Sequence, residues 1–251
     1  MSIAIVTGAS SGIGADFCKE LDDRGLECIW MVSRNASRMG SLADGLSTPV
    51  RIVPCDLASV ADRDSLRALI SEEAPDIGYL VNCAGLGRFG DPVGMPVEDA
   101  RAMIDVNISA VVELTSACIP FMRPGSRIIT LCSEAAYVST YNLNVYASTK
   151  SFIRSYLDAL RLEVEDRGIG VLEVSPGWVD TPFIGDCIDN HDVPVKVFGH
   201  KVQSIDVVRK ALKDSDSGRR RSVCGFQTRM VIALASHLPG FAARIWRGYW
   251  K

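Results

Sequence analysis

A glycine-rich loop near the N-terminus constrains the fold of this chain more than any other feature. The apolar run Ile3–Val6 predicts a buried strand, and the apolar spacing from Phe17 to Leu21 predicts a helix. Gly8, Gly12 and Gly14 lie between the two. A strand, a glycine turn and a helix in this order are typical of a dinucleotide-binding site, whereas an isolated glycine loop is more often a plain turn.

Each glycine has a separate role in such a site. Gly8 permits the tight turn, Gly12 lets the backbone approach a pyrophosphate, and Gly14 permits close contact between helix and strand. The helix N-terminus then offers unpaired N–H groups and a partial positive charge to the phosphates. The loop residues that we assign to cofactor binding are Gly8, Ser10, Ser11, Gly12, Ile13 and Gly14.

The next predicted strand, Cys28–Ser33, indicates which cofactor the site takes. An NAD site places Asp or Glu about 20 residues after the loop to bind the ribose. This chain instead has Ser33 and Arg34 there, with Arg38 one turn further on. A guanidinium pairs with a 2′-phosphate, so we expect NADP(H). The alternative is that Arg34 is a solvated loop residue.

A second group of residues has the spacing needed for proton transfer. The apolar run Arg127–Ser133 predicts a buried strand with Ser133 at its carboxyl end, where parallel sheets bind ligands. Tyr146 and Lys150 share one face of a helix predicted over about residues 143–167. A free tyrosine has a pKa of about 10, and an adjacent ammonium favours the phenolate. Tyr146 can then act as a general acid or base, while Ser133 binds the substrate oxygen.

These motifs together resemble the short-chain dehydrogenase/reductase superfamily over essentially the full length of the chain. The loop matches the Thr-Gly-x-x-x-Gly-x-Gly pattern of that family, and Tyr146-x-x-x-Lys150 follows Ser133 in the expected order. Asn82-Cys-Ala-Gly85 resembles the family's Asn-Asn-Ala-Gly segment. Cys83 departs from the pattern, which puts a local hydrogen bond within the sheet in doubt.

The resemblance implies further roles. It makes Ser133, Tyr146, Lys150 and Asn107 the catalytic set, with Asn107 holding a water that links Lys150 to solvent. Lys150 would lower the pKa of Tyr146 and also anchor the nicotinamide ribose. The remaining cofactor contacts that it implies are Ser33, Arg34, Asp56, Leu57, Asn82, Ala84, Gly85, Tyr146, Lys150, Pro176, Gly177, Val179 and Thr181.

Length and composition favour one α/β domain over residues 1–251. The chain is 47% apolar, which suffices for one large core. Predicted strands and helices alternate throughout, so we expect a Rossmann-type, doubly wound parallel sheet with helices on both faces. A net charge of −3 gives no indication of nucleic-acid binding, and we interpret Arg219–Arg221 as a solvated loop.

Cysteine and histidine usage predicts neither disulfides nor a metal site. The eight cysteines form no Cys-x-x-Cys pair and do not cluster with the three histidines. Their positions in predicted strands and helices suit small buried apolar residues. With no signal-peptide pattern at the N-terminus, we expect a cytoplasmic protein.

Two regions are expected to select the substrate. Leu86 and Phe89 follow the Asn82–Gly85 segment, and residues 183–203 would form a lid by resemblance to the family. The apolar lid residues are Phe183, Ile184, Ile188, Val193, Val195, Val197 and Phe198. This content favours a hydrophobic substrate, although a lid also uses such residues to pack. We interpret His191 and His200 as packing residues; Lys196 and Lys201 would suit a phosphate-bearing thioester carrier.

The C-terminal segment over residues 228–251 combines apolar, aromatic and basic residues. Its apolar part is too short to span a bilayer and is interrupted by Pro239. It either packs on a partner subunit or over its own active site, or lies on a membrane surface. We favour packing. The tail loosely resembles the end of the subgroup that reduces 3-oxoacyl thioesters and steroid ketones.

The sequence therefore predicts an NADP(H)-dependent oxidoreductase that interconverts a hydrophobic ketone and its secondary alcohol, as a carbonyl, 3-oxoacyl or hydroxysteroid reductase. The resemblance also implies a homodimer or homotetramer built through the helices that carry Asn107 and Tyr146. One alternative is a fold-mate that senses NADP(H) without catalysis, although such proteins tend to lose the Tyr or the Lys. Another is an enzyme that works in the direction of alcohol oxidation.

Overall fold

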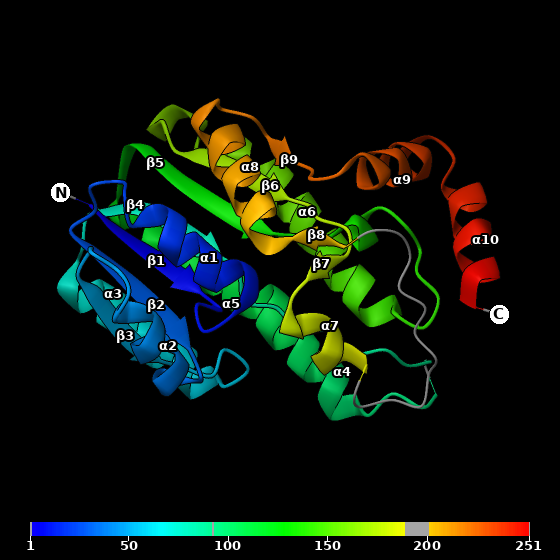
Figure 1. Ribbon diagram of the computed structural model, residues 1–251, viewed down its shortest axis with the longest axis horizontal. Coiled ribbons are helices and arrows are strands. Elements are labelled where there is room, and N and C mark those ends of the chain that lie inside the picture. The colour runs from blue at the N-terminus through cyan, green and yellow to red at the C-terminus, as the bar shows by residue number, and fades with distance from the viewer. Residues whose placement is uncertain (1, 92, 189–200, 251) are drawn as a thin grey trace.

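A seven-stranded parallel sheet forms the centre of the protein (Figure 1). The computed structural model describes residues 2–91, 93–188 and 201–250. The sheet confirms the predicted doubly wound α/β architecture. In the order of their pairing, the strands are β3 (Val50–Pro54), β2 (Cys28–Ser33), β1 (Ile3–Thr7), β4 (Ile77–Asn82), β5 (Met122–Leu131), β6 (Gly170–Val174) and β9 (Arg221–Ser222).

Helices cover both faces of this sheet, and each face has its own apolar core (Figure 1). Side chains alternate along a strand. Ile3 and Ile5 of β1 therefore point into one core, and Ala4 and Val6 point into the other. The helices of the first core are α3 (Val60–Glu73), α5 (Ala110–Cys118) and α6 (Asn144–Glu163); those of the second are α1 (Gly12–Leu21), α2 (Ala36–Ala43) and α8 (Ser204–Asp216).

Some element boundaries differ from those predicted. β5 begins at Met122 and ends at Leu131, so Ser133 lies two residues beyond the strand rather than at its last position. α6 ends at Glu163, four residues before the expected end, and the short 3₁₀ turn η4 (Glu165–Arg167) follows it, closed by Gly168 in a left-handed conformation (φ 65°). Arg221, interpreted from the sequence as part of a solvated loop, instead begins the short strand β9 (Arg221–Ser222).

α4 (Val97–Ile104), the π-helical turn η1 (Asp105–Ser109), α5 and the 3₁₀ turn η2 (Ile119–Phe121) follow one another without a break. By length and composition this stretch is apolar enough to cross a membrane. Its α5 part, however, buries Val111 and Leu114 in the first core, against the sheet. Core helices of soluble proteins pass the same test, so we interpret the stretch as a core helix.

The segments that follow β6 surround the carboxyl edge of the sheet. β7 (Val179–Asp180) and β8 (Val202–Gln203) form a small parallel pair, and α7 (Pro182–Ile188) carries the first part of the expected lid. The C-terminal segment forms α9 (Phe226–His237) and α10 (Pro239–Trp250), which lie at one end of the molecule (Figure 1). The lid residues Val193, Val195, Lys196, Val197 and Phe198, together with His191 and His200, lie outside the described residues.

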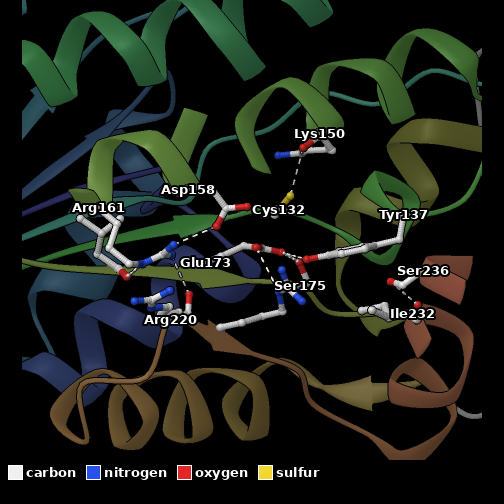
Figure 2. Close-up of polar contacts among 12 residues, drawn as sticks. Cys132, Tyr137, Lys150, Asp158, Arg161, Glu173, Ser175, Arg220, Ile232 and Ser236 are labelled. Atoms are coloured by element: carbon white, nitrogen blue, oxygen red, sulfur yellow. Dashed lines mark hydrogen bonds and ion pairs between the residues drawn. The ribbon is translucent and has the colours of Figure 1, made fainter. Parts of the chain in front are cut away.

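A buried carboxylate connects β6 to its neighbours (Figure 2). Glu173 is 1% exposed, and accepts hydrogen bonds from the hydroxyls of Tyr137 and Ser175. The Nε atom of Arg221 on β9 donates to the same carboxylate over 3.1 Å. Three donors offset the cost of burying this charge, because an unpaired buried carboxylate is strongly destabilising. The network therefore holds β9 and the chain around Tyr137 against β6.

Removing one of the hydrogen-bond donors to Glu173 should show how much this network stabilises the folded protein. We expect Tyr137→Phe to lower the free energy of unfolding by about 1.5–3 kcal/mol, because the buried carboxylate loses a hydrogen bond. Tyr79→Phe is the matched control: the Tyr79 hydroxyl accepts from the partly exposed Arg24, so the loss should stay below about 1 kcal/mol. Urea unfolding of the two variants checks this, and equal losses would contradict it.

Candidate active site

A cavity of about 560 Å³ opens at the carboxyl edge of the parallel sheet. Strand order reverses between β1 and β4, and this reversal is where doubly wound sheets bind ligands. The predicted site residues that line the cavity are Gly8, Ser10, Ser11, Gly12, Ile13, Gly14, Ser33, Arg34, Asp56, Leu57, Ala84, Gly85, Ser133, Tyr146, Lys150, Pro176, Gly177, Val179 and Thr181. Asn82 and Asn107 are the two predicted residues that do not line it.

The glycine loop leaves no room for side chains. Gly8 and Gly12 adopt left-handed conformations (φ 67° and 53°), which other residues rarely adopt. A Cβ at Gly8 would stand 2.9 Å from the backbone of Ala84, and a Cβ at Gly14 would overlap the carbonyl oxygen of Gly8. Ser11 precedes α1 without capping it through its side chain. The loop and the first turn of α1 thus offer backbone N–H groups to the cavity, which fits a pyrophosphate.

Thr7 holds the loop against the end of β4, a role that sequence reasoning missed. Its hydroxyl accepts hydrogen bonds from the backbone N–H groups of Cys83 and Ala84, over 3.0 and 3.1 Å. The side chain of Asn82 points into the core instead, where its amide nitrogen donates to Thr115 and Thr130. Because Cys83 is held through its backbone, its departure from the family pattern leaves this link between β1 and β4 intact.

The carboxyl ends of β2 and β3 line the other side of the cavity. The hydroxyl of Ser33 donates to that of Ser10 over 2.8 Å, and so joins β2 to the glycine loop. Arg34 is exposed and forms no ion pair with any residue that the structure describes. Its guanidinium therefore remains available for an anionic group. A carboxylate oxygen of Asp56 accepts from the backbone N–H of Ala58, which fixes the turn after β3.

Tyr146, Lys150 and Ser133 meet deep in the cavity. Lys150 is 4% exposed; its Nζ donates to the carbonyl oxygen of Leu131 over 2.8 Å and lies 5.8 Å from the centre of the Tyr146 ring. The thiol of Cys132 donates to the carbonyl oxygen of Lys150, which ties α6 to the end of β5 (Figure 2). Ser133 accepts from the backbone N–H of Ala135 and hydrogen-bonds Tyr146.

Burial dominates the electrostatics of the two titratable groups. It raises the pKa of Tyr146 above its usual range, and nearby Cys187 and Glu134 act in the same direction, while the hydrogen bond with Ser133 opposes them. Burial also lowers the pKa of Lys150. The expected lowering of the Tyr146 pKa by Lys150 is therefore outweighed, because the ammonium is itself desolvated in the same pocket. Burial therefore favours the neutral phenol at Tyr146.

Asn107 lies behind the cavity, in the π-helical turn η1. It is fully buried. Its side-chain oxygen accepts from the N–H of Leu86, while its amide nitrogen donates to the Leu86 carbonyl and to the Thr149 hydroxyl. A Cβ at Gly85 would stand 3.6 Å from Asn107 Oδ1 and 3.7 Å from Lys150 Nζ, so both side chains border Gly85. Asn107 thus fixes the loop after β4 beside Lys150; the water relay stays a prediction.

Glu134 is the second cavity residue that sequence reasoning missed. It follows Ser133 and begins the 3₁₀ turn η3 (Glu134–Ala136). Its Oε2 atom stands 3.0 Å from where a Cβ of Gly177 would lie, and the hydroxyl of Thr228 borders the same glycine. Burial raises its pKa from 4.5 to about 7. No local sequence pattern indicates this, because Gly177 and Thr228 come close to Glu134 only through the fold.

Apolar side chains line the part of the cavity beyond Ser133 and Tyr146. Phe183 of α7 packs against Tyr146, with ring centres 6.0 Å apart. A Cβ at Gly87 would meet the side chains of both Phe183 and Cys187, so this wall is closely packed. The other large apolar residues here are Leu86, Phe89, Val138, Leu143, Trp178, Ile184 and, from α10, Trp246. This end of the cavity suits an apolar molecule.

Known proteins match the chain over most of its length. A family model described as short chain dehydrogenase matches residues 2–191. An uncharacterized oxidoreductase of Staphylococcus epidermidis is 33% identical over 182 residues, 72% of this chain and 79% of that protein. A probable short-chain type dehydrogenase/reductase of Helicobacter pylori, VdlC, is 29% identical over 94% of this chain and 93% of its own length.

A solved structure is similar as well. The short-chain dehydrogenase from Sphingobium yanoikuyae, determined in complex with NADPH, superposes with a TM-score of 0.81 at 25% identity. The match covers 96% of this chain and 95% of that one. The fold and the order of its elements are therefore shared over nearly the whole of both chains.

The raised pKa of Glu134 makes a prediction about stability. Burial favours the protonated acid, so its stabilisation is complete below about pH 4.5 and is lost as the pH rises through about 7. We expect Glu134→Gln, which stays neutral, to gain about 2–3 kcal/mol of unfolding free energy relative to the unmodified protein between about pH 4.5 and pH 8. Urea unfolding at both pH values checks this. A difference that does not change with pH would contradict it.

Proposed function

Because the chain belongs to the short-chain dehydrogenase family, and is thus an oxidoreductase, we propose that it uses NADP(H) to interconvert a hydrophobic ketone and its secondary alcohol. One observation carries the proposal: Ser133, Tyr146 and Lys150 converge in the same cavity as the glycine loop. A proton donor and a dinucleotide site in one cavity are what reduction of a carbonyl needs.

The residues of the cavity fit a nicotinamide dinucleotide. The backbone of Gly12 and Ile13 would hold its pyrophosphate at the N-terminus of α1, where a Cβ at Gly12 would stand 3.1 Å from the side chain of Thr181. Asp56 and Leu57 would border the adenine, and the Pro176–Thr181 loop would border the nicotinamide end. When bound, the cofactor supplies or accepts the hydride of the reaction.

The chain's own residues manage the proton. Tyr146, kept protonated by burial, would donate to the carbonyl oxygen during reduction. Ser133 already hydrogen-bonds Tyr146, so its hydroxyl would orient the same oxygen and stabilise negative charge on it. Lys150 would anchor the ribose and, with Asn107, which borders the same side of Gly85, pass the proton on from solvent.

Two properties of the cavity support NADP(H) as the cofactor and a hydrophobic ketone as the substrate. Arg34 lines the cavity and forms no ion pair within the described part of the chain, which favours NADP(H) over NAD(H), and the similar Sphingobium enzyme was solved with NADPH. The apolar end beyond Tyr146 favours a hydrophobic ketone, of the size of a 3-oxoacyl chain or a steroid.

We also propose that the protein is a homo-oligomer and that it is cytoplasmic. Residues 1–251 of each copy would form one oxidoreductase domain. The helices that carry Asn107 and Tyr146 expose apolar side chains away from the sheet: Ile104 is 45% exposed, Phe152 47% and Leu162 66%. Packing these helices against those of a second copy would cover these side chains. The cysteines, which are free throughout the described residues, suit a reducing compartment.

The site gives less support to the alternative that the protein is an NADP(H) sensor. A sensor needs no proton donor, whereas here Tyr146, Ser133 and Lys150 are all directed into one cavity. The direction of alcohol oxidation uses the same residues with the proton transfer reversed. The ratio of oxidised to reduced cofactor would set the direction in the cell.

Removal of the phenolic hydroxyl tests the mechanism. We expect Tyr146→Phe to lower kcat by about 10²–10⁴-fold and to leave NADPH affinity unchanged, because the variant lacks only the proton donor. Tyr141→Phe, exposed and outside the cavity, is the control and should keep full turnover. NADPH consumption and fluorescence titration measure the two effects. Full turnover in Tyr146→Phe would refute the mechanism, whereas NADPH binding with no turnover by the unmodified protein would favour the sensor.

Reversing the charge at Arg34 tests the cofactor. We expect Arg34→Asp to weaken NADPH binding by about 10–100-fold, because a carboxylate repels the 2′-phosphate, and to leave NADH binding unchanged or stronger. Arg123→Asp makes the same change of charge at an exposed position outside the cavity, and should alter neither affinity. If the unmodified protein bound NADH more tightly than NADPH, the assignment would be wrong.

A further inference from the structure

The outer surfaces of α9 and α10 expose large apolar side chains. Phe226 is 79% exposed and Met230 55%, both on α9; Phe241 is 56% exposed and Ile245 39%, both on α10. Within each pair the residues are four positions apart, and therefore lie on one side of their helix. We refer to these four residues as the C-terminal apolar stripes. Side chains of this size and exposure indicate an interaction surface.

The inner surfaces of the same helices attach to the body. Ala235 and Ala242 are buried against Val138, with Leu234 and Trp246 packed around them. Trp246 also lines the active-site cavity. Packing over the active site, one of the two packing arrangements that we favoured from the sequence beside packing on a partner subunit, thus describes the inner side of these helices. It does not cover the stripes.

The charged side chains in this part of the chain are all basic. Residues 217–251 contain seven Lys and Arg and no Asp or Glu, in a chain with a net charge of −3. Arg229 on α9 and Arg244 and Arg247 on α10 are exposed and adjoin the stripes in sequence. Basic and apolar groups on one exposed helical surface are typical of helices that lie in the interface of a membrane. Anionic lipid headgroups complement both the charge and the apolar surface.

We propose that α9 and α10 dock the protein on an anionic lipid surface, with the C-terminal apolar stripes in the interfacial layer and the arginines on the headgroups. A second copy of this chain is the less favourable occupant of the surface. A symmetric contact through the stripes would bring the same uncompensated arginines of two copies together. An anionic bilayer has no such repulsion.

Docking would also affect access to the cavity. Trp246 lines the cavity from the inner side of α10, while Phe241 and Ile245 would enter the lipid from its outer side. The mouth of the cavity beside α10 would then lie close to the bilayer, from which an apolar substrate can enter directly. This consequence rests on the proposed function, whereas the docking itself does not.

Sedimentation with vesicles tests the docking without any measurement of turnover. We expect the full-length protein to sediment with phosphatidylserine–phosphatidylcholine vesicles at low salt, but not with pure phosphatidylcholine, and to be released at high salt. Ile245→Ser and Arg244→Glu should each lower the bound fraction by about threefold to tenfold. The controls Val60→Ser and Lys213→Glu make comparable changes at exposed positions on α3 and α8, and should bind normally.

NADPH binding by each variant establishes that it is folded, since neither stripe nor arginine lines the cavity. The docking proposal fails if the unmodified protein does not sediment with anionic vesicles, or if the controls lose binding as much as the stripe variants. It also fails if Ile245→Ser dissociates an oligomer in solution while vesicle binding is absent, because the occupant is then a second copy. Absence of ketone turnover by the unmodified protein would count against the proposed function and not against docking.

Discussion

The close contact of three backbone segments at the end of β1 sets the geometry of the whole site. Gly8 lies against Ala84 after β4, and Gly14 at the start of α1 lies against Gly8. Any side chain at these glycines would push α1 or β4 away from β1, and the hydroxyl of Thr7 closes the same junction with hydrogen bonds. The crevice at the reversal of strand order exists because these segments approach so closely. The other residues that border the crevice, such as Ser33 and Lys150, are positioned relative to this junction.

Local patterns in the sequence predicted the architecture and most of the lining of the cavity. Short apolar runs between turn residues identify buried strands, and a spacing of four residues puts Tyr146 and Lys150 on one helical face. What they missed depends on contacts between distant segments. Asn82 was expected at the cofactor but hydrogen-bonds Thr115 and Thr130 in the core. Glu134 borders Gly177 and Thr228, which lie more than 40 and 90 residues further along the chain.

The electrostatics of the site also depend on the fold rather than on local sequence patterns. The positions of Tyr146 and Lys150 suggested that the ammonium stabilises the phenolate, but burial affects both groups and favours the neutral form of each. Glu134 adds to the effect on Tyr146 when it is charged, and its pKa of about 7 means that its charge changes near neutral pH. The proton donor and this carboxyl are therefore coupled.

Chemistry and substrate access come from different parts of the chain. The family match ends at residue 191, and includes the glycine loop, Ser133, Tyr146 and Lys150. Trp246 lines the cavity from α10, a helix beyond that match, which packs on the body through Ala242 and Trp246 itself. Because the proposed catalytic groups lie just beyond the end of β5 and on α6, a change in the position of α10 would alter which molecules reach Tyr146 rather than the proton transfer itself.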